Sequence, residues 1–121
     1  MALFDIDPML NAMLDTAPGI SDLNLSVGRP PQVEIDGALR PVEFAGIQKL
    51  MPYHTELIAL RLLQGKRDLA EKLLRTGSTD LSYSLAKRTR FRVNVFSQRG
   101  SYSVVLRVIP NKIPSVADLG L

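Results

Sequence analysis

Residues 90–110, RFRVNVFSQRGSYSVVLRVIP, contain two runs in which apolar and polar side chains alternate around a short turn. Alternation with a period of two is typical of β-strands that bury one face. A turn centred on Arg99 and Gly100 pairs the runs so that Phe91 lies opposite Val108 on an almost wholly apolar face. This stretch constrains the fold most strongly, because it predicts two strands, their turn and their register together.

The same register places Arg92 directly across from Arg107 on the other face. A slip by one residue would move Arg107 to the core side against Phe91, which is disfavoured. Directly opposed like charges destabilise a strand pair by up to ~1 kcal/mol. Two interpretations remain: water and nearby carboxylates offset the repulsion, or an anion such as phosphate lies between two guanidinium groups that each donate bidentate hydrogen bonds.

The distribution of charge favours the anion. The net charge of +3 is uneven, because residues 1–83 carry 8 basic and 11 acidic side chains whereas residues 84–121 carry 7 basic and 1 acidic. No carboxylate occurs between Ser84 and Ala117. The basic side chains of the second part must therefore find partners in the first part, on another chain or on an anionic ligand.

Upstream of the helical region the sequence predicts one helix and three strands. Asp7 is typical of an N-cap and Pro8 of the first helical position, and the Pro18-Gly19 pair should end that helix. Residues 22–27 alternate like a strand with one buried face. Asp36-Gly37 is a strong tight-turn signal, which predicts a hairpin between two short strands.

Residues 46–76 predict two helices. Thr55 is a candidate cap for the first, which Gly65 closes, and the second ends at Gly77. A strand over residues 79–86 then leads into the hairpin. The order of elements predicts an α+β fold, a PAS-like antiparallel sheet with helices packed mainly on one face.

Composition limits the class of protein. The 121 residues fit one domain, and the absence of cysteine excludes disulfides and thiolate metal sites. The N-terminus lacks the basic start of a secretory signal, and no apolar run approaches the ~20 residues that span a membrane. These features predict a soluble, cytosolic protein.

No self-sufficient active site is evident. His54 is the only histidine, and a lone histidine before a helix is more typical of a surface or capping residue than of a catalyst. No phosphate-binding loop, GxGxxG motif or metal-ligand spacing occurs. RFRVNVF faintly resembles an RNA-recognition signature, but Phe91 falls on the apolar face and Phe96 is the one ring placed for stacking.

Four strings lie in order along the chain: SDLNLSVGRPPQVEIDGALRPV, GSTDLSYSL, RFRVNVFSQRGSYSVVLRVIP and IPSVADLGL. Together they resemble the N-terminal domain of the PilT family, the type IV pilus retraction ATPases of twitching motility. The resemblance runs over nearly the whole chain and is weakest around residues 44–75. Asn24 departs from it, because the family usually has histidine there.

The resemblance implies a PAS-like N-terminal domain over residues 1–112 and, at 113–121, the start of a linker to a RecA-like ATPase core that this chain lacks. The fragment would then be no enzyme by itself, whereas the full-length protein would be an ATPase that uses ATP and Mg. The implied partners are its own and neighbouring ATPase cores in a homohexamer and the pilus platform protein of the inner membrane, without nucleic acid. The implied location is cytoplasmic, at the inner-membrane base of the pilus machine.

The resemblance also implies roles for single residues. The family's two phosphate-contacting arginines correspond to Arg92 and Arg107, the pair that the register opposes. Arg90 and Arg99 are weaker candidates, for a secondary contact or for the subunit interface. No catalytic residue and no metal ligand is expected in this chain. The alternative functions are a stand-alone PAS-like ligand or interaction module and a small nucleic-acid-binding domain.

Overall fold

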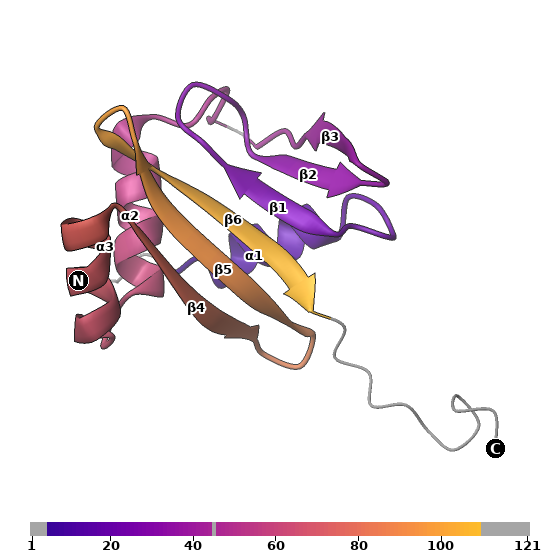
Figure 1. Cartoon of the computed structure of the whole chain (residues 1–121). Helices are drawn as coiled ribbons and strands as arrows, with labels where there is room; N and C mark the ends of the chain where they lie inside the picture. Colours follow the sequence, from indigo (N-terminus) through magenta and orange to yellow (C-terminus); the bar gives the residue numbers. More distant parts are fainter. Residues whose placement is uncertain (1–4, 45, 110–121) are drawn as a thin grey trace, which may run out of the picture.

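A computed structural model of the chain describes residues 5–44 and 46–109 (Figure 1). Within them, six strands form one antiparallel sheet in the order β3-β2-β1-β6-β5-β4, accompanied by three helices. This confirms the predicted α+β class and antiparallel sheet. In chain order the elements are α1 (Asp7–Leu14), β1 (Asp22–Leu25), β2 (Gln32–Ile35), β3 (Ala38–Pro41), α2 (Pro52–Leu62), α3 (Arg67–Thr76), β4 (Ser78–Leu85), β5 (Thr89–Gln98) and β6 (Ser101–Ile109).

The hairpin of β5 and β6 has the predicted turn and register. Arg99 and Gly100 both adopt positive φ, 53° and 78°, as a two-residue hairpin turn of the primed type requires. Arg92 is the partner of Arg107, and Phe91 is the partner of Val108. The Asp36-Gly37 hairpin between β2 and β3 is also confirmed, with φ of 51° and 81° at the two turn residues.

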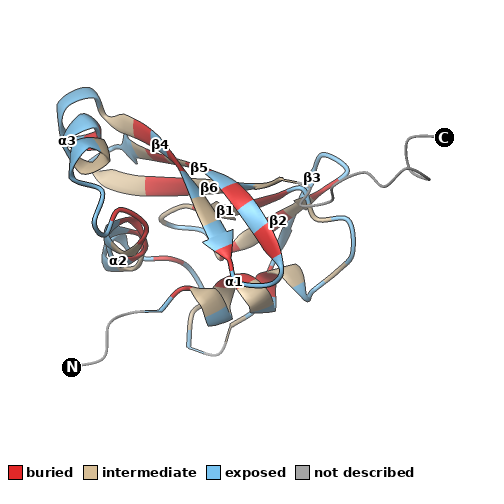
Figure 2. Ribbon diagram, turned by 90° about the horizontal axis from the view of Figure 1, so that it is seen from below, coloured by how far each residue is buried: buried red, intermediate tan, exposed pale blue. Residues whose placement is uncertain are grey.

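The core lies on one face of the sheet, and α1 and α2 pack against that face (Figure 2). α3 lies beside β4 at one end of the sheet. The larger core side chains with less than 2% exposure are Phe91, Ile6, Leu10, Met13, Leu23, Leu25, Leu50, Leu62 and Leu106. None of the described helices covers the opposite face, which we call the open face.

The two edges of the sheet differ in length. β3 has four residues, is exposed at every position and ends at Pro41. β4 has eight residues and packs against α3. Within residues 5–44 and 46–109, no helix is long and apolar enough to cross a membrane.

The predicted cap of α1 is wrong. The helix begins at Asp7, and Ile6 takes the N-cap position without a side-chain hydrogen bond. The Asp7 carboxylate instead accepts a hydrogen bond from the Tyr83 hydroxyl on β4. A tertiary contact has thus taken the side chain that a local capping rule assigned to the helix terminus.

The predicted cap of α2 is also wrong. The helix begins at Pro52, one turn before the expected start, and Thr55 is fully buried inside it, with its hydroxyl donating to the Pro52 carbonyl at 3.2 Å. His54 Nδ1 accepts a hydrogen bond from the Met51 N–H at 2.9 Å. The lone histidine therefore helps to cap a helix.

The remaining boundaries lie close to the predicted ones. β1 ends at Leu25, and Val27 forms an isolated parallel bridge to Leu50 rather than extending the strand. α3 ends at Gly77 in a left-handed conformation with φ of 87°, as the glycine predicts. The predicted linker start at 113–121 lies outside the described residues.

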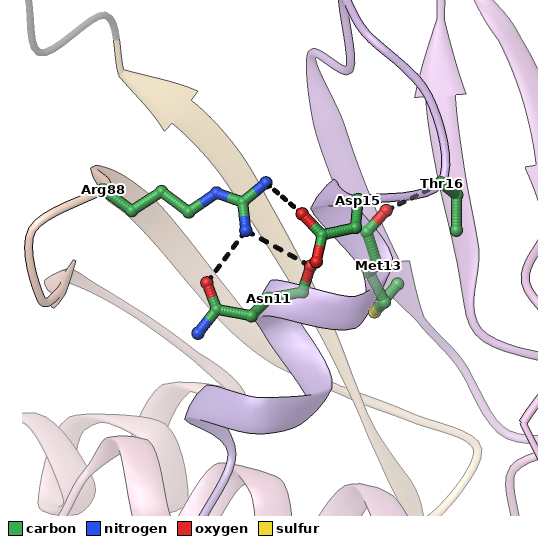
Figure 3. A network of polar contacts seen from close by, with 5 residues as sticks. All are labelled: Asn11, Met13, Asp15, Thr16 and Arg88. Atoms are coloured by element: carbon green, nitrogen blue, oxygen red, sulfur yellow. Dashed lines mark hydrogen bonds and ion pairs between the residues drawn. The ribbon is translucent and has the colours of Figure 1, made fainter.

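Polar contacts fasten α1 to the strands at two points. Besides the Tyr83–Asp7 bond, Arg88 in the β4–β5 turn donates to Asn11 Oδ1 at 3.0 Å and to Asp15 Oδ1 at 2.7 Å (Figure 3). Burial, together with the hydrogen bond to Asp7, raises the pKa of Tyr83 from 10.0 to about 12. These contacts hold the first helix against the same end of the sheet as the β4–β5 turn.

Candidate anion-binding site

A row of four charged residues crosses the open face of the sheet. Arg92 on β5 is the neighbour of Arg107 on β6, Arg107 is the neighbour of Asp22 on β1, and Asp22 is the neighbour of Glu34 on β2. Directly opposed residues of antiparallel strands have Cα atoms roughly 4.5–5.5 Å apart. The sheet therefore places a basic pair beside an acidic pair, on side chains held by a rigid ladder.

Asp22 offsets part of the charge of Arg107. Arg107 Nε lies 3.3 Å from Asp22 Oδ1, and the Arg107 side chain is 71% exposed whereas that of Asp22 is 9% exposed. The contact uses Nε, and within the described residues the two Nη groups make no hydrogen bond. The Asp22 carboxylate thus offsets part of the repulsion between Arg92 and Arg107, and most of the Arg107 side chain remains exposed to solvent.

Arg92 forms no ion pair with any residue that the structure describes. The nearest acidic side chain in the next strand, Asp80, accepts a hydrogen bond from Asn94 Nδ2 at 2.9 Å instead. Both arginines line a shallow hollow of about 370 Å³ whose other walls include Asp80, Asn94 and Val105. An exposed guanidinium next to a second one, at the rim of a hollow, is suited to an oxyanion.

The structure brings together some of the predicted site residues and separates others. Arg92 and Arg107 are adjacent, and Arg90 lies two positions along β5, exposed on the same face but opposite Ile109. Arg99 lies in the β5–β6 turn, seven residues beyond Arg92, which corresponds to about 23 Å of extended strand. One phosphate group cannot contact both Arg92 and Arg99.

Sequence reasoning did not identify Asp22 as part of the site. Its alternation with Leu23 predicts that it lies on the polar face, but not that β1 pairs with β6. The excess of basic residues in the second half of the chain was the available signal, since a carboxylate from the first half was one of the partners that it allowed, beside another chain and an anionic ligand.

The RNA-recognition resemblance finds little support in the geometry. Phe91 is completely buried and Phe96 is half-buried, so the described open face lacks the pair of exposed rings on which bases stack.

A separate hollow of about 360 Å³ lies on the helix side, between α1 and α2, and is lined mainly by apolar residues such as Met9, Phe44 and Leu57.

No protein-family model matches the chain. The type IV pilus retraction ATPase PilT of Pseudomonas aeruginosa is 32% identical over 103 residues, which are 85% of this chain and 28% of PilT. The type IV pilus ATPase PilU of the same organism is 31% identical over an alignment of 121 positions that covers 97% of this chain and 29% of PilU. The chain therefore spans less than a third of the length of either relative.

Solved structures agree with these relatives. The crystal structure of the pilus retraction motor PilT with bound ADP matches with a TM-score of 0.75 and 32% identity, over 98% of this chain and 33% of that one. The ATPase DotB of Legionella pneumophila matches with a TM-score of 0.67 over 95% of this chain and 32% of DotB, and its 22% identity supports the fold alone.

The sheet, its helices and these relatives define a domain of the type IV pilus ATPases. Within that class the chain is homologous to PilT and PilU, and it represents the N-terminal domain of the PilT family.

Proposed function

We propose that this domain works in a hexameric pilus retraction motor, where Arg92 and Arg107 contact the phosphates of ATP held by a RecA-like core. The observation that carries the proposal is their adjacency on the open face, with no ion pair to Arg92 among the described residues. The ADP in the structure of PilT supports a nucleotide as the ligand. ATP with Mg would supply the anion and the energy of hydrolysis.

The role of the two arginines is to couple nucleotide state to domain position. Both guanidinium groups hold the domain closed over the nucleotide site while a terminal phosphate is present, because their attraction depends on its charge. After hydrolysis removes that charge, the closed arrangement is no longer lower in free energy than the open one, and the domain swings relative to its core. The fragment itself contributes binding and movement, and catalysis resides in the core.

The partners follow from the same proposal. The domain packs on the ATPase core of a neighbouring subunit in a ring of six, and the ring acts on the platform protein at the inner-membrane base of the pilus, on its cytoplasmic side. Arg90 lies on the open face beside the pair and is a candidate for the subunit interface.

Substitution of the arginines tests the proposal in the native protein that carries the ATPase core. Arg92→Ala or Arg107→Ala should each lower ATP turnover roughly a thousandfold or more, as loss of an arginine finger does. Arg92→Lys keeps the charge but loses the planar fork, and should rescue turnover incompletely. Arg75 is an exposed arginine on α3, and Arg75→Ala is the control. Wild-type turnover in both Arg92→Ala and Arg107→Ala would contradict the phosphate role.

The length of the native protein is a second test. An antibody against this domain should detect a species much larger than 13.4 kDa in cells that express the protein at its natural level. A species at the mass of the chain alone would contradict the motor and favour the stand-alone ligand module. That rival would use the apolar hollow between α1 and α2, and a small molecule retained through purification would support it.

A further inference from the structure

A second polar hollow lies at the end of the sheet where β1 leads into β2 and β5 turns into β6. The two connections are far apart in sequence but lie at the same end of the sheet (Figure 1). The hollow measures about 480 Å³, and its polar lining is Ser26, Arg29, Gln98, Arg99, Ser101 and Ser103. It is separate from the hollow at Arg92 and Arg107.

The lining of this second hollow offers hydrogen-bond donors and positive charge. It contains two guanidinium groups, three hydroxyls and one amide, and no carboxylate. Neither Arg29 nor Arg99 forms an ion pair within the part of the chain that the structure describes. The charge therefore remains available to an anion.

Ser103 is the buried part of the lining. It is 3% exposed, and its hydroxyl lies 3.4 Å from Gln98 Oε1, its one hydrogen-bond partner among the described residues. Hydroxyl hydrogen bonds in proteins are typically about 2.7–2.8 Å long. The contact is thus weak, and the Ser103 hydroxyl can exchange it for a ligand oxygen at low cost.

Backbone contacts fix the position of both arginines' loops. Arg99 lies in the tight turn with Gly100, where both residues adopt positive φ. The loop of Arg29 is held by Leu50, which accepts from the Gly28 N–H and donates to the Arg29 carbonyl, both at 2.8 Å. A preorganised pair of loops loses little backbone freedom on binding, which favours affinity.

We propose that this hollow binds a phosphate group through Arg29, Arg99 and the surrounding hydroxyls. A tetrahedral oxyanion offers more acceptor oxygens than a carboxylate, which matches two guanidinium forks and three hydroxyls. The site goes beyond the proposed function, because Arg99 is about 23 Å along the strand from Arg92. It does not depend on the role of the Arg92–Arg107 pair.

The test is a titration of the 15N-labelled 121-residue chain with inorganic phosphate at constant ionic strength, followed by NMR. The expected result is saturable shifts of amide signals in residues 26–29 and 98–103. The Arg29→Ala/Arg99→Ala double variant should raise the Kd roughly tenfold or more. Arg40→Ala, an exposed arginine on the β3 edge, should leave the Kd unchanged.

The outcomes separate this site from the proposed nucleotide contact. Shifts that saturate only around Arg92 and Arg107 would overturn the second site while leaving the first intact. Shifts around residues 98–103 that survive Arg92→Ala/Arg107→Ala would support it. Equal affinity for acetate would overturn the assignment to phosphate, and so would shifts that do not saturate.

Further arms of the titration identify the source of the phosphate. Tighter binding of ADP than of inorganic phosphate, lost in the Arg29→Ala/Arg99→Ala variant, would assign a nucleotide. Sedimentation with phosphatidylglycerol vesicles but not with phosphatidylcholine vesicles, lost in the same variant, would assign a lipid headgroup. If inorganic phosphate binds more tightly than ADP and than phosphatidylglycerol vesicles, the ligand is the free ion.

Discussion

Tyr83 and Asp7 join the sheet to the first turn of α1, and the pKa of Tyr83 makes this contact sensitive to alkaline pH. Burial is the largest cause of the raised pKa, and the hydrogen bond to Asp7 adds to it. The folded-state pKa of about 12 lies above the unfolded value of 10.0. The protonated hydroxyl therefore stabilises the fold fully below pH 10, and this contribution is lost as the pH rises toward 12.

Replacement of Tyr83 by phenylalanine should remove that dependence. Tyr83→Phe is expected to lower the free energy of unfolding by about 1 kcal/mol at neutral pH, since one hydrogen bond to a carboxylate is lost at a half-exposed site. The difference from wild type should shrink between pH 10 and 12 in urea unfolding experiments. Tyr53→Phe, at a 59% exposed position, is the control, and a difference that stays constant over this range would contradict the assignment.

At the level of elements, the attachment of α1 depends on Arg88 in the β4–β5 turn. The Arg88 side chain is 35% exposed and bridges Asn11 and Asp15 (Figure 3). Arg88→Ala should loosen the C-terminal half of α1 and lower the free energy of unfolding by about 1 kcal/mol. Hydrogen exchange should become faster for amides of residues 10–15.

A matched control exists on the next strand. Arg90→Ala removes an exposed arginine that forms no ion pair within the described residues, and exchange in α1 should stay at the wild-type rate. Equal protection of α1 in wild type and Arg88→Ala would show that the apolar contacts of Leu10 and Met13, both buried, hold the helix by themselves.

Turns and strands could be predicted from the sequence more accurately than helix caps. A two-residue hairpin turn of this type requires positive φ at two consecutive residues, which glycine adopts readily and aspartate tolerates, so Asp36-Gly37 indicates the turn directly. At Arg99-Gly100 the glycine favours the turn, and the alternation in the two flanking strands fixes its position. Asp7 and Thr55 are good capping residues, yet Asp7 has a tertiary partner in Tyr83 and Thr55 is buried in the core. Local rules cannot anticipate such partners.

At the scale of the whole molecule, the charged row depends on a strand pairing between distant parts of the chain. The opposition of Arg92 and Arg107 follows from one tight turn and was predictable. The position of Asp22 beside Arg107 requires β1 to pair with β6, 85 residues away. No local signal encodes that pairing, so half of the charged row could not be predicted.

Removal of the Asp22 carboxylate measures what the long-range contact contributes. Asp22→Asn should lower the free energy of unfolding by about 1 kcal/mol, because the buried partner loses its charge while Arg107 remains largely solvated. The loss should diminish at high salt, since the Arg107 side of the contact is screened. Urea unfolding at two salt concentrations provides the measurement.

Glu34 provides the comparison within the same row. Glu34→Gln removes the adjacent carboxylate, which makes no ion pair among the described residues, and its effect on the free energy of unfolding should be close to zero. Equal losses in the two variants would mean that the overall charge of the row, rather than the Asp22–Arg107 contact, stabilises the sheet.

The short β3 edge bears on how the protein behaves at high concentration. Unpaired backbone groups at the edge of a sheet can recruit a strand from another molecule, which is a route to fibrils. β3 has only four residues and therefore presents few such groups. Its last residue, Pro41, has no N–H and cannot donate a hydrogen bond to an added strand. Strand-to-strand polymerisation through the sheet would use both of its edges, so the short β3 edge disfavours the assembly of this domain into fibrils.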